Sequence, residues 1–201
     1  MPTGSLPQSG SAPNASRRRA SRALAVLALA AGGLVAPPAS ADVIPVKRAE
    51  LRVDDGEVHL NAEFDLSLNA TLEEALQKGV PLYFVLEVEV TRPRWYWLDE
   101  KVLAMSTTWR VSYAPLAQAY RVSTGLISQT AASIAEVERL IGRVTSRAIA
   151  RTADLAPGVR YDAAVRLRLD VNQLPKPFQV DALASREWQL ASEWRRFAFT
   201  P

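Results

Sequence analysis

Apolar and polar residues alternate along several stretches of this 201-residue chain, most regularly between residues 161 and 171. Successive side chains of a β-strand point to opposite faces, so a period of two predicts a strand with one buried and one solvated face. The apolar members of this set are Tyr161, Ala163, Val165, Leu167, Leu169 and Val171. A strand that is polar on one face is typical of an antiparallel sheet.

Other stretches with less regular or shorter alternation predict further strands. They cover residues 46–54, 58–68, 82–91, 95–98, 101–113, 119–124, 178–183 and 187–199. The acidic sequence at 54–57 contains Gly56, which readily takes positive φ, and it predicts a hairpin turn between the first two strands. Residues 174–177 include two prolines and predict an extended connection.

Two segments have the spacing of a helix capping box. The pairs are Thr71 with Glu74 and Ser133 with Glu136. The first predicts a helix over 69–78 that stops at Gly79, and the second predicts a helix from Ser133, whose continuation to Ala150 is opposed by Gly142. We therefore expect a mainly β fold, an antiparallel β-sandwich with one or two short α-helices, with an α+β fold as the alternative.

The first 41 residues have the pattern of a secretory signal peptide. An arginine cluster precedes an apolar run at 23–36, two prolines follow, and Ala39 and Ala41 form a small-x-small cleavage site. The run is shorter than the ~20 residues that span a bilayer, so cleavage after Ala41 is expected. The prediction is a single β-rich domain, residues 42–201, in the periplasm, with an inner-membrane anchor formed by an uncleaved leader as the alternative.

Charge and composition exclude several function classes. Four of the 24 Lys and Arg residues but none of the 21 acidic residues lie in the leader, so the remaining chain carries a formal charge of −1. Nucleic-acid binding uses a strong basic field, and no nucleic-acid partner is expected. The chain has no cysteine, which excludes disulfides, thiol nucleophiles and Cys-ligated zinc.

No catalytic, cofactor or metal site is predicted, and the chain is not expected to be an enzyme. His59 is the sole histidine, and an exposed position on the polar face of a strand is the favoured interpretation. Acidic residues two apart share a strand face, which could serve acid-base chemistry but is also the spacing of any solvated face. These pairs are Glu87 with Glu89 and Glu63 with Asp65. The turn at 54–57 lacks the twelve-residue loop of a calcium site.

One aromatic and arginine-rich segment is the strongest candidate for an interaction surface. Its residues are Arg92, Arg94, Trp95, Tyr96 and Trp97. Alternation places the two tryptophans on one face, so packing in the core is the favoured interpretation and a docking platform is the alternative.

Three arginines, Arg160, Arg166 and Arg168, predict a cationic stripe along the most regular strand. Such a stripe can bind a carboxylate or phosphate in bidentate fashion. Pairing with acidic residues of neighbouring strands, such as Glu63 or Glu87, is the favoured interpretation.

Several stretches together resemble a known family. They are residues 95–97, 120–125, 166–170, 173–177 and 181–185, with Trp188. These stretches resemble the exported proteins of Gram-negative bacteria called DUF4390, a domain of unknown function, also described as proline-rich signal peptide proteins. The resemblance implies export to the periplasm, one domain, no assigned chemistry and an association with a membrane sensor kinase as partner.

The expected function is therefore a non-catalytic binding or interaction domain. A metal-independent hydrolase of envelope material and a carrier of an apolar ligand are the alternatives. A hydrolase would need polar residues that converge in a deep pocket, and a carrier would need a cavity between the sheets.

Overall fold

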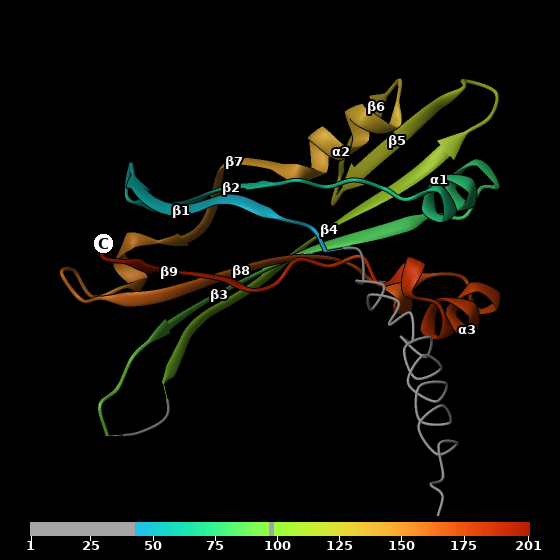
Figure 1. The fold of residues 1–201 in the computed structure, drawn as a ribbon. Helices are drawn as coiled ribbons and strands as arrows, with labels where there is room; N and C mark the ends of the chain where they lie inside the picture. Colours follow the sequence, from blue (N-terminus) through green and yellow to red (C-terminus); the bar gives the residue numbers. More distant parts are fainter. Residues whose placement is uncertain (1–42, 97–98) are drawn as a thin grey trace, which may run out of the picture. The chain divides into compact units, whose positions relative to one another are not determined.

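The computed structural model describes residues 43–96 and 99–201, all of which belong to one unit of the chain, residues 40–201 (Figure 1). The predicted leader and its cleavage site at Ala39 and Ala41 lie outside the described residues.

In the described residues, nine strands form two antiparallel sheets. The three-stranded sheet has the order β1 (Val46–Asp54), β2 (Glu57–Phe64), β7 (Arg143–Arg151). The six-stranded sheet has the order β6 (Ile127–Ala131), β5 (Ala119–Thr124), β4 (Glu100–Ala114), β3 (Leu82–Arg92), β8 (Tyr161–Leu169), β9 (Arg195–Phe199). The prediction of a mainly β, sandwich-like fold is confirmed, and both sheets are open.

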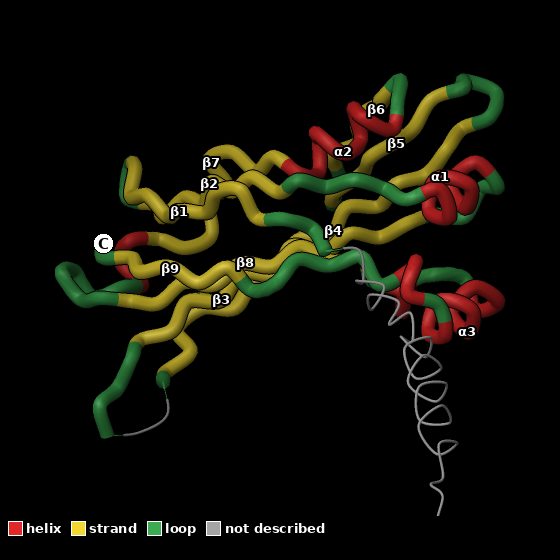
Figure 2. The backbone as a smooth tube through the Cα atoms, in the orientation of Figure 1, coloured by secondary structure: helices red, strands yellow, loops and turns green. Residues whose placement is uncertain are grey.

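The inner faces of the sheets share one hydrophobic core. β1, β2 and β7 lie together on one side of β3, β8 and β9 (Figure 2). Every second residue of β8, from Tyr161 to Leu169, is buried, and Val58 and Leu60 of β2 are fully buried in the same core. Full burial of one such side chain stabilises the fold by about 1.5–3 kcal/mol. The alternation predicted for both strands is therefore confirmed.

The turn and both capped helices are present, with one correction. Positive φ angles at Asp55 and Gly56 form the β1–β2 hairpin turn. Helix α1 (Ala70–Gln77) is capped by Asn69, whose Oδ1 accepts a hydrogen bond from the Leu72 amide at 3.0 Å, and not by Thr71, as the capping-box spacing predicted. The Thr71 hydroxyl instead donates to a carboxylate oxygen of Glu187 at 2.7 Å.

Helix α2 (Ile134–Gly142) begins at the predicted cap, but the chain then turns directly into a strand. Ser133 Oγ accepts from the Glu136 amide at 3.3 Å. Residues 143–151 form β7 rather than a continued helix, because β2 offers an open edge with which they pair and Val144 and Ile149 reach the core. The sequence pattern did not predict β6 either.

The C-terminal part departs most from the predictions. Helix α3 (Lys176–Ala184) replaces both the extended connection at 174–177 and the strand at 178–183. Pro177 lies in the first turn of α3. Backbone N–H groups in the first turn have no acceptor within the helix, so the missing N–H of proline costs no helical hydrogen bond there. Residues 187–199 form a named strand only over β9. A short 3-10 helix ends at Trp188, and residues 190–192 then make only an isolated antiparallel bridge to the end of β8. The described residues therefore contain three α-helices, where one or two were expected.

The end of α2 packs closely on β2, and Gly142 makes this approach feasible. A Cβ atom at position 142 would lie 2.7 Å from the carbonyl oxygen of Phe64. We predict that Gly142→Ala lowers the free energy of unfolding by about 1–3 kcal/mol, although alanine has the higher helix propensity. Denaturant titration measures this change in the free energy of unfolding. Ala135→Gly, on the exposed side of α2, is the control that measures the effect of helix propensity alone. An unchanged midpoint for Gly142→Ala would contradict the close packing.

Glu138 of α2 is held in a half-buried position by the chain before α1. Its Oε1 accepts a hydrogen bond from the Leu68 amide at 2.7 Å. Burial raises the pKa of Glu138 above its ordinary value of 4.5, although the Leu68 amide acts in the opposite direction. For a raised folded-state pKa, the stabilising contribution is complete below about pH 4.5 and is lost as the pH rises through the folded value.

We therefore predict that Glu138→Gln, which keeps the acceptor oxygen and removes the charge, raises the unfolding midpoint near neutral pH and has little effect at acidic pH. Glu138→Ala also removes the acceptor, so it should be about 1 kcal/mol less stable than Glu138→Gln at both pH values. Unfolding curves at several pH values test this. A uniform effect of Glu138→Gln across the pH range would show that the charge is not the cause.

Candidate functional site

The loop that joins β3 to β4 carries two exposed aromatic side chains. Trp95 is 95% exposed and Tyr96 is 67% exposed. Their rings meet edge to face, with centroids 5.2 Å apart. Core packing, the favoured interpretation from the sequence, is wrong for Trp95, and residues 95 and 96 form a turn rather than a strand. Trp97 lies outside the described residues.

Arginines at the base of this loop converge on one carboxylate. Arg92 Nε donates to Glu100 Oε2 at 3.0 Å, and Arg94 Nη2 lies 2.5 Å from the same oxygen. The hydrogen bonds from Arg92 and Arg94 lower the pKa of Glu100. The hydrogen bond between Arg92 and Glu100 also raises the pKa of Arg92. Both guanidinium groups thus bind Glu100 at the base of the loop, so neither is a free cation. We call Arg92, Arg94, Trp95, Tyr96 and Glu100 the hairpin tip.

The arginine stripe on β8 lies elsewhere. Arg168 Nη2 lies 3.1 Å from Glu87 Oε1 on β3, and Arg168 Nη1 lies 3.2 Å from Asp170 Oδ1. Cross-strand pairing with Glu87 is therefore confirmed for Arg168. Arg166 is half-buried and makes no side-chain ion pair with any described residue, and Arg160 is exposed just before β8.

The residues predicted to form one interaction surface thus lie in two places, the hairpin tip and β8. β3 and β8 pair from Phe84–Leu169 to Thr91–Asp162, so Asp162 marks the end of β8 next to the hairpin tip. Arg166 is four residues further along the strand, about 13 Å away. The hairpin tip and the stripe therefore do not form one contact surface, although Arg160 lies near the base of the tip.

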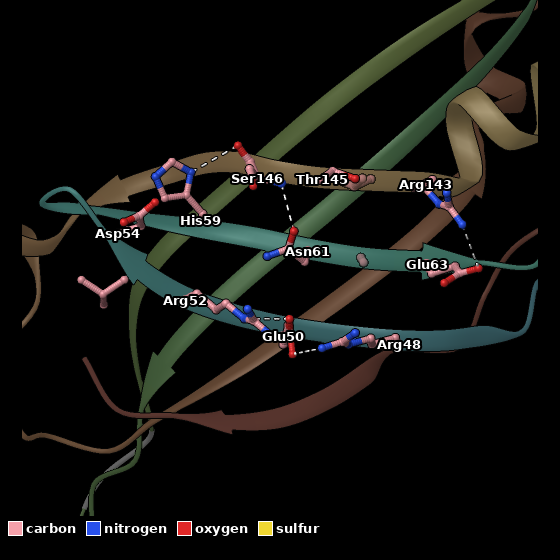
Figure 3. A pocket seen from close by; sticks show the side chains of 13 residues that line it. Arg48, Glu50, Arg52, Asp54, His59, Asn61, Glu63, Arg143, Thr145 and Ser146 are labelled. Atoms are coloured by element: carbon pink, nitrogen blue, oxygen red, sulfur yellow. Dashed lines mark hydrogen bonds and ion pairs between the residues drawn. The ribbon is translucent and has the colours of Figure 1, made fainter.

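The outer face of the three-stranded sheet holds a pocket of about 670 Å³ (Figure 3). Its charged lining comes from β1, β2 and β7: Arg48, Glu50, Arg52, Asp54, His59, Glu63 and Arg143. Most of these charges pair with one another, since both Arg48 and Arg52 contact Glu50, at 2.7 and 2.9 Å. A carrier of an apolar ligand needs an apolar lining, which this pocket lacks.

A bulge in β7 forms one wall of this pocket. The β2–β7 register shifts between Leu60 and Ala62, and Ser146 takes a φ of +45°, which is strained for a residue with a Cβ atom. Asn61 Oδ1 accepts from the Ser146 amide at 3.0 Å, and His59 Nδ1 contacts the Ser146 carbonyl oxygen at 3.2 Å (Figure 3). The bulge covers His59, whose side chain is only 19% exposed, less than predicted for this polar face.

Three comparisons with known proteins bear on the identity of the chain. A family model for DUF4390, a domain of unknown function, matches residues 41–198. The chain belongs to the DUF4390 family. No curated protein and no solved structure matches it. The family resemblance expected from the sequence is therefore confirmed, and it assigns no activity to this DUF4390 domain.

The acidic pairs of the DUF4390 domain face basic partners. Glu89 contacts Lys101 at 2.7 Å, Asp65 contacts Lys47 at 2.9 Å, and Glu63 lies 3.9 Å from Arg143. No group of three or more potential metal ligands occurs in residues 43–96 and 99–201. In the same residues, no helix is long and apolar enough to cross a membrane.

Sequence reasoning missed the Ser146 bulge. Asn61 and His59 were visible as neighbours on one strand face, but no strand was predicted over residues 143–151, where continuation of the helix was left open. The partner of these two side chains is therefore brought by a strand more than 80 residues away in the sequence.

The left-handed conformation of Ser146 gives a direct test of the bulge. A β-branched residue is poorly tolerated at a φ of +45°, so we predict that Ser146→Val lowers the free energy of unfolding by about 1–2 kcal/mol. The neighbouring exposed substitution Thr145→Val, which also introduces valine on β7, is expected to be near neutral. Equal unfolding midpoints for the two variants would contradict a strained bulge.

Proposed function

We propose that this DUF4390 domain is an exported, non-catalytic binding module of the bacterial envelope, and that it contacts its target through the hairpin tip. The observation that carries the proposal is the exposure of Trp95 beside Tyr96. Burial of a large aromatic side chain is favourable, so an aromatic ring exposed to water gains free energy when a partner covers it. Such side chains dominate the energetics of binding surfaces. The leader sequence supports export.

The arrangement of charges supports binding rather than catalysis. On the outer sheet faces, several carboxylates contact arginine or lysine side chains, and Glu50 alone accepts two arginines. Acid-base catalysis uses carboxylates whose pKa values are driven apart and which face a substrate cavity. Glu100, at the base of the hairpin tip, instead has a lowered pKa because Arg92 and Arg94 bind it.

The target is another envelope component, and the sensory region of a membrane kinase is the protein candidate that the family resemblance implies. Photo-crosslinking in intact cells tests the proposal, with the native leader retained in the gene and the mature N-terminus read by mass spectrometry. A photoreactive amino acid at position 95 is expected to give a reproducible adduct. The same probe at Leu116, a fully exposed residue of the β4–β5 turn, is the matched control.

We predict that Tyr96→Ala lowers the yield of the position-95 adduct roughly tenfold, as expected for one aromatic residue of a binding surface. Because Tyr96 is largely exposed, its loss should leave the unfolding midpoint unchanged. Equal adducts from positions 95 and 116, or an adduct that Tyr96→Ala does not weaken, would refute the hairpin tip as the binding surface.

A further inference from the structure

We infer that the target of the hairpin tip is the interfacial layer of a lipid bilayer, into which Trp95 and Tyr96 insert. This inference rests on the proposed function, because it names the class of target for the same surface. Four properties of the hairpin tip carry it: side-chain chemistry, ring geometry, charge balance and projection beyond the sheet.

The two exposed residues have the chemistry of the membrane interface. Tryptophan and tyrosine each combine an apolar ring with one polar group, N–H or O–H, and both are enriched where lipid headgroups meet acyl chains. Their edge-to-face contact, with ring planes at 72°, holds the rings together at one point of the loop. They therefore present a single amphipathic wedge rather than two scattered side chains.

The charges of residues 89–101, the segment that carries this wedge, balance. They are Arg92, Arg94 and Lys101 against Glu89, Asp99 and Glu100, and the exposed Arg160 lies outside this segment. Each of the three cations contacts a carboxylate of this set. Protein-binding hot spots use arginine as a free bidentate donor, whereas both guanidinium groups here are already bound to Glu100. A neutral aromatic tip favours a bilayer interface over a charged protein surface.

The hairpin tip also extends past the sheet that supports it. β8 pairs with β3 only as far as Thr91, and Arg92 pairs only with Glu100 of β4. Figure 1 shows the loop continuing away from β8 and β9. Trp95 follows Arg92 by three residues, so it lies at most about 10 Å beyond this pair. Interfacial insertion reaches about 5–10 Å, so the wedge can enter a bilayer without desolvating the rest of the sheet.

Vesicle flotation with the exported, processed protein tests the inference. Wild-type protein is expected to float with phosphatidylcholine vesicles, and Trp95→Ala combined with Tyr96→Ala should lower the bound fraction roughly tenfold, because the buried aromatic area is lost. Leu116→Ala combined with Leu126→Ala is the matched control, since both leucines are fully exposed in other turns. Every variant carries the same N-terminus, so any contribution of that end cancels.

Two further readouts show whether the rings insert. Vesicles with brominated acyl chains should quench part of the tryptophan fluorescence of the wild-type protein. Trp95→Phe should not show this quenching, because it lacks the inserted tryptophan. Binding should also change little between low and high salt, because it depends on apolar burial rather than on charge. An unchanged unfolding midpoint of the double variant excludes misfolding as the cause of lost binding.

The outcomes separate the inference from the proposed function. Absence of wild-type flotation, flotation of the double variant equal to wild type, or binding abolished by salt overturns bilayer insertion. If vesicles are not bound but position 95 crosslinks to an envelope protein, the inference fails and the proposed function stands. If neither vesicles nor a crosslinked partner is found, both fail.

Discussion

The shared burial of alternating strand faces is the constraint on which the rest of this structure depends. β8 and β2 each place every second side chain in the core between the sheets. Because the period of a strand is two, the same geometry forces the intervening residues onto the outer faces. The charged outer face of β1, β2 and β7 and the arginines on β8 are therefore consequences of the core, and no separate functional cause is needed for their presence there.

The charged side chains of the outer faces form salt bridges, because neighbouring strands carry side chains of opposite charge. Glu87 on β3 meets Arg168 on β8, and Glu89 meets Lys101 on β4. Exposed pairs of this kind contribute about 0–1 kcal/mol each, so they complement the fold rather than drive it. The hairpin tip differs from these faces, because its paired charges at Glu100 support two aromatic rings that no other described residue covers. This difference is the reason why we propose the hairpin tip as the binding surface.

The sequence predicted elements well wherever a pattern is local and strong. The strands at 58–68 and 161–171, the acidic turn and the caps near Ser133 depend on residues close in the chain, and the structure contains each of them with small shifts of boundary. Prediction failed where a distant element decides. Residues 143–151 became a strand because β2 offers an edge, and residues 176–184 became a helix despite Pro175 and Pro177.

The sequence by itself therefore determined the mainly β class, the family and which faces of the long strands are apolar, since alternation is a property of consecutive residues. Only the tertiary structure decided the bulge at Ser146, because its partners Asn61 and His59 lie on a different strand. It also decided that Trp95 is exposed. β3 and β4 extend past their neighbour β8, and a side chain beyond the last pairing of a sheet has no opposing layer against which to be buried.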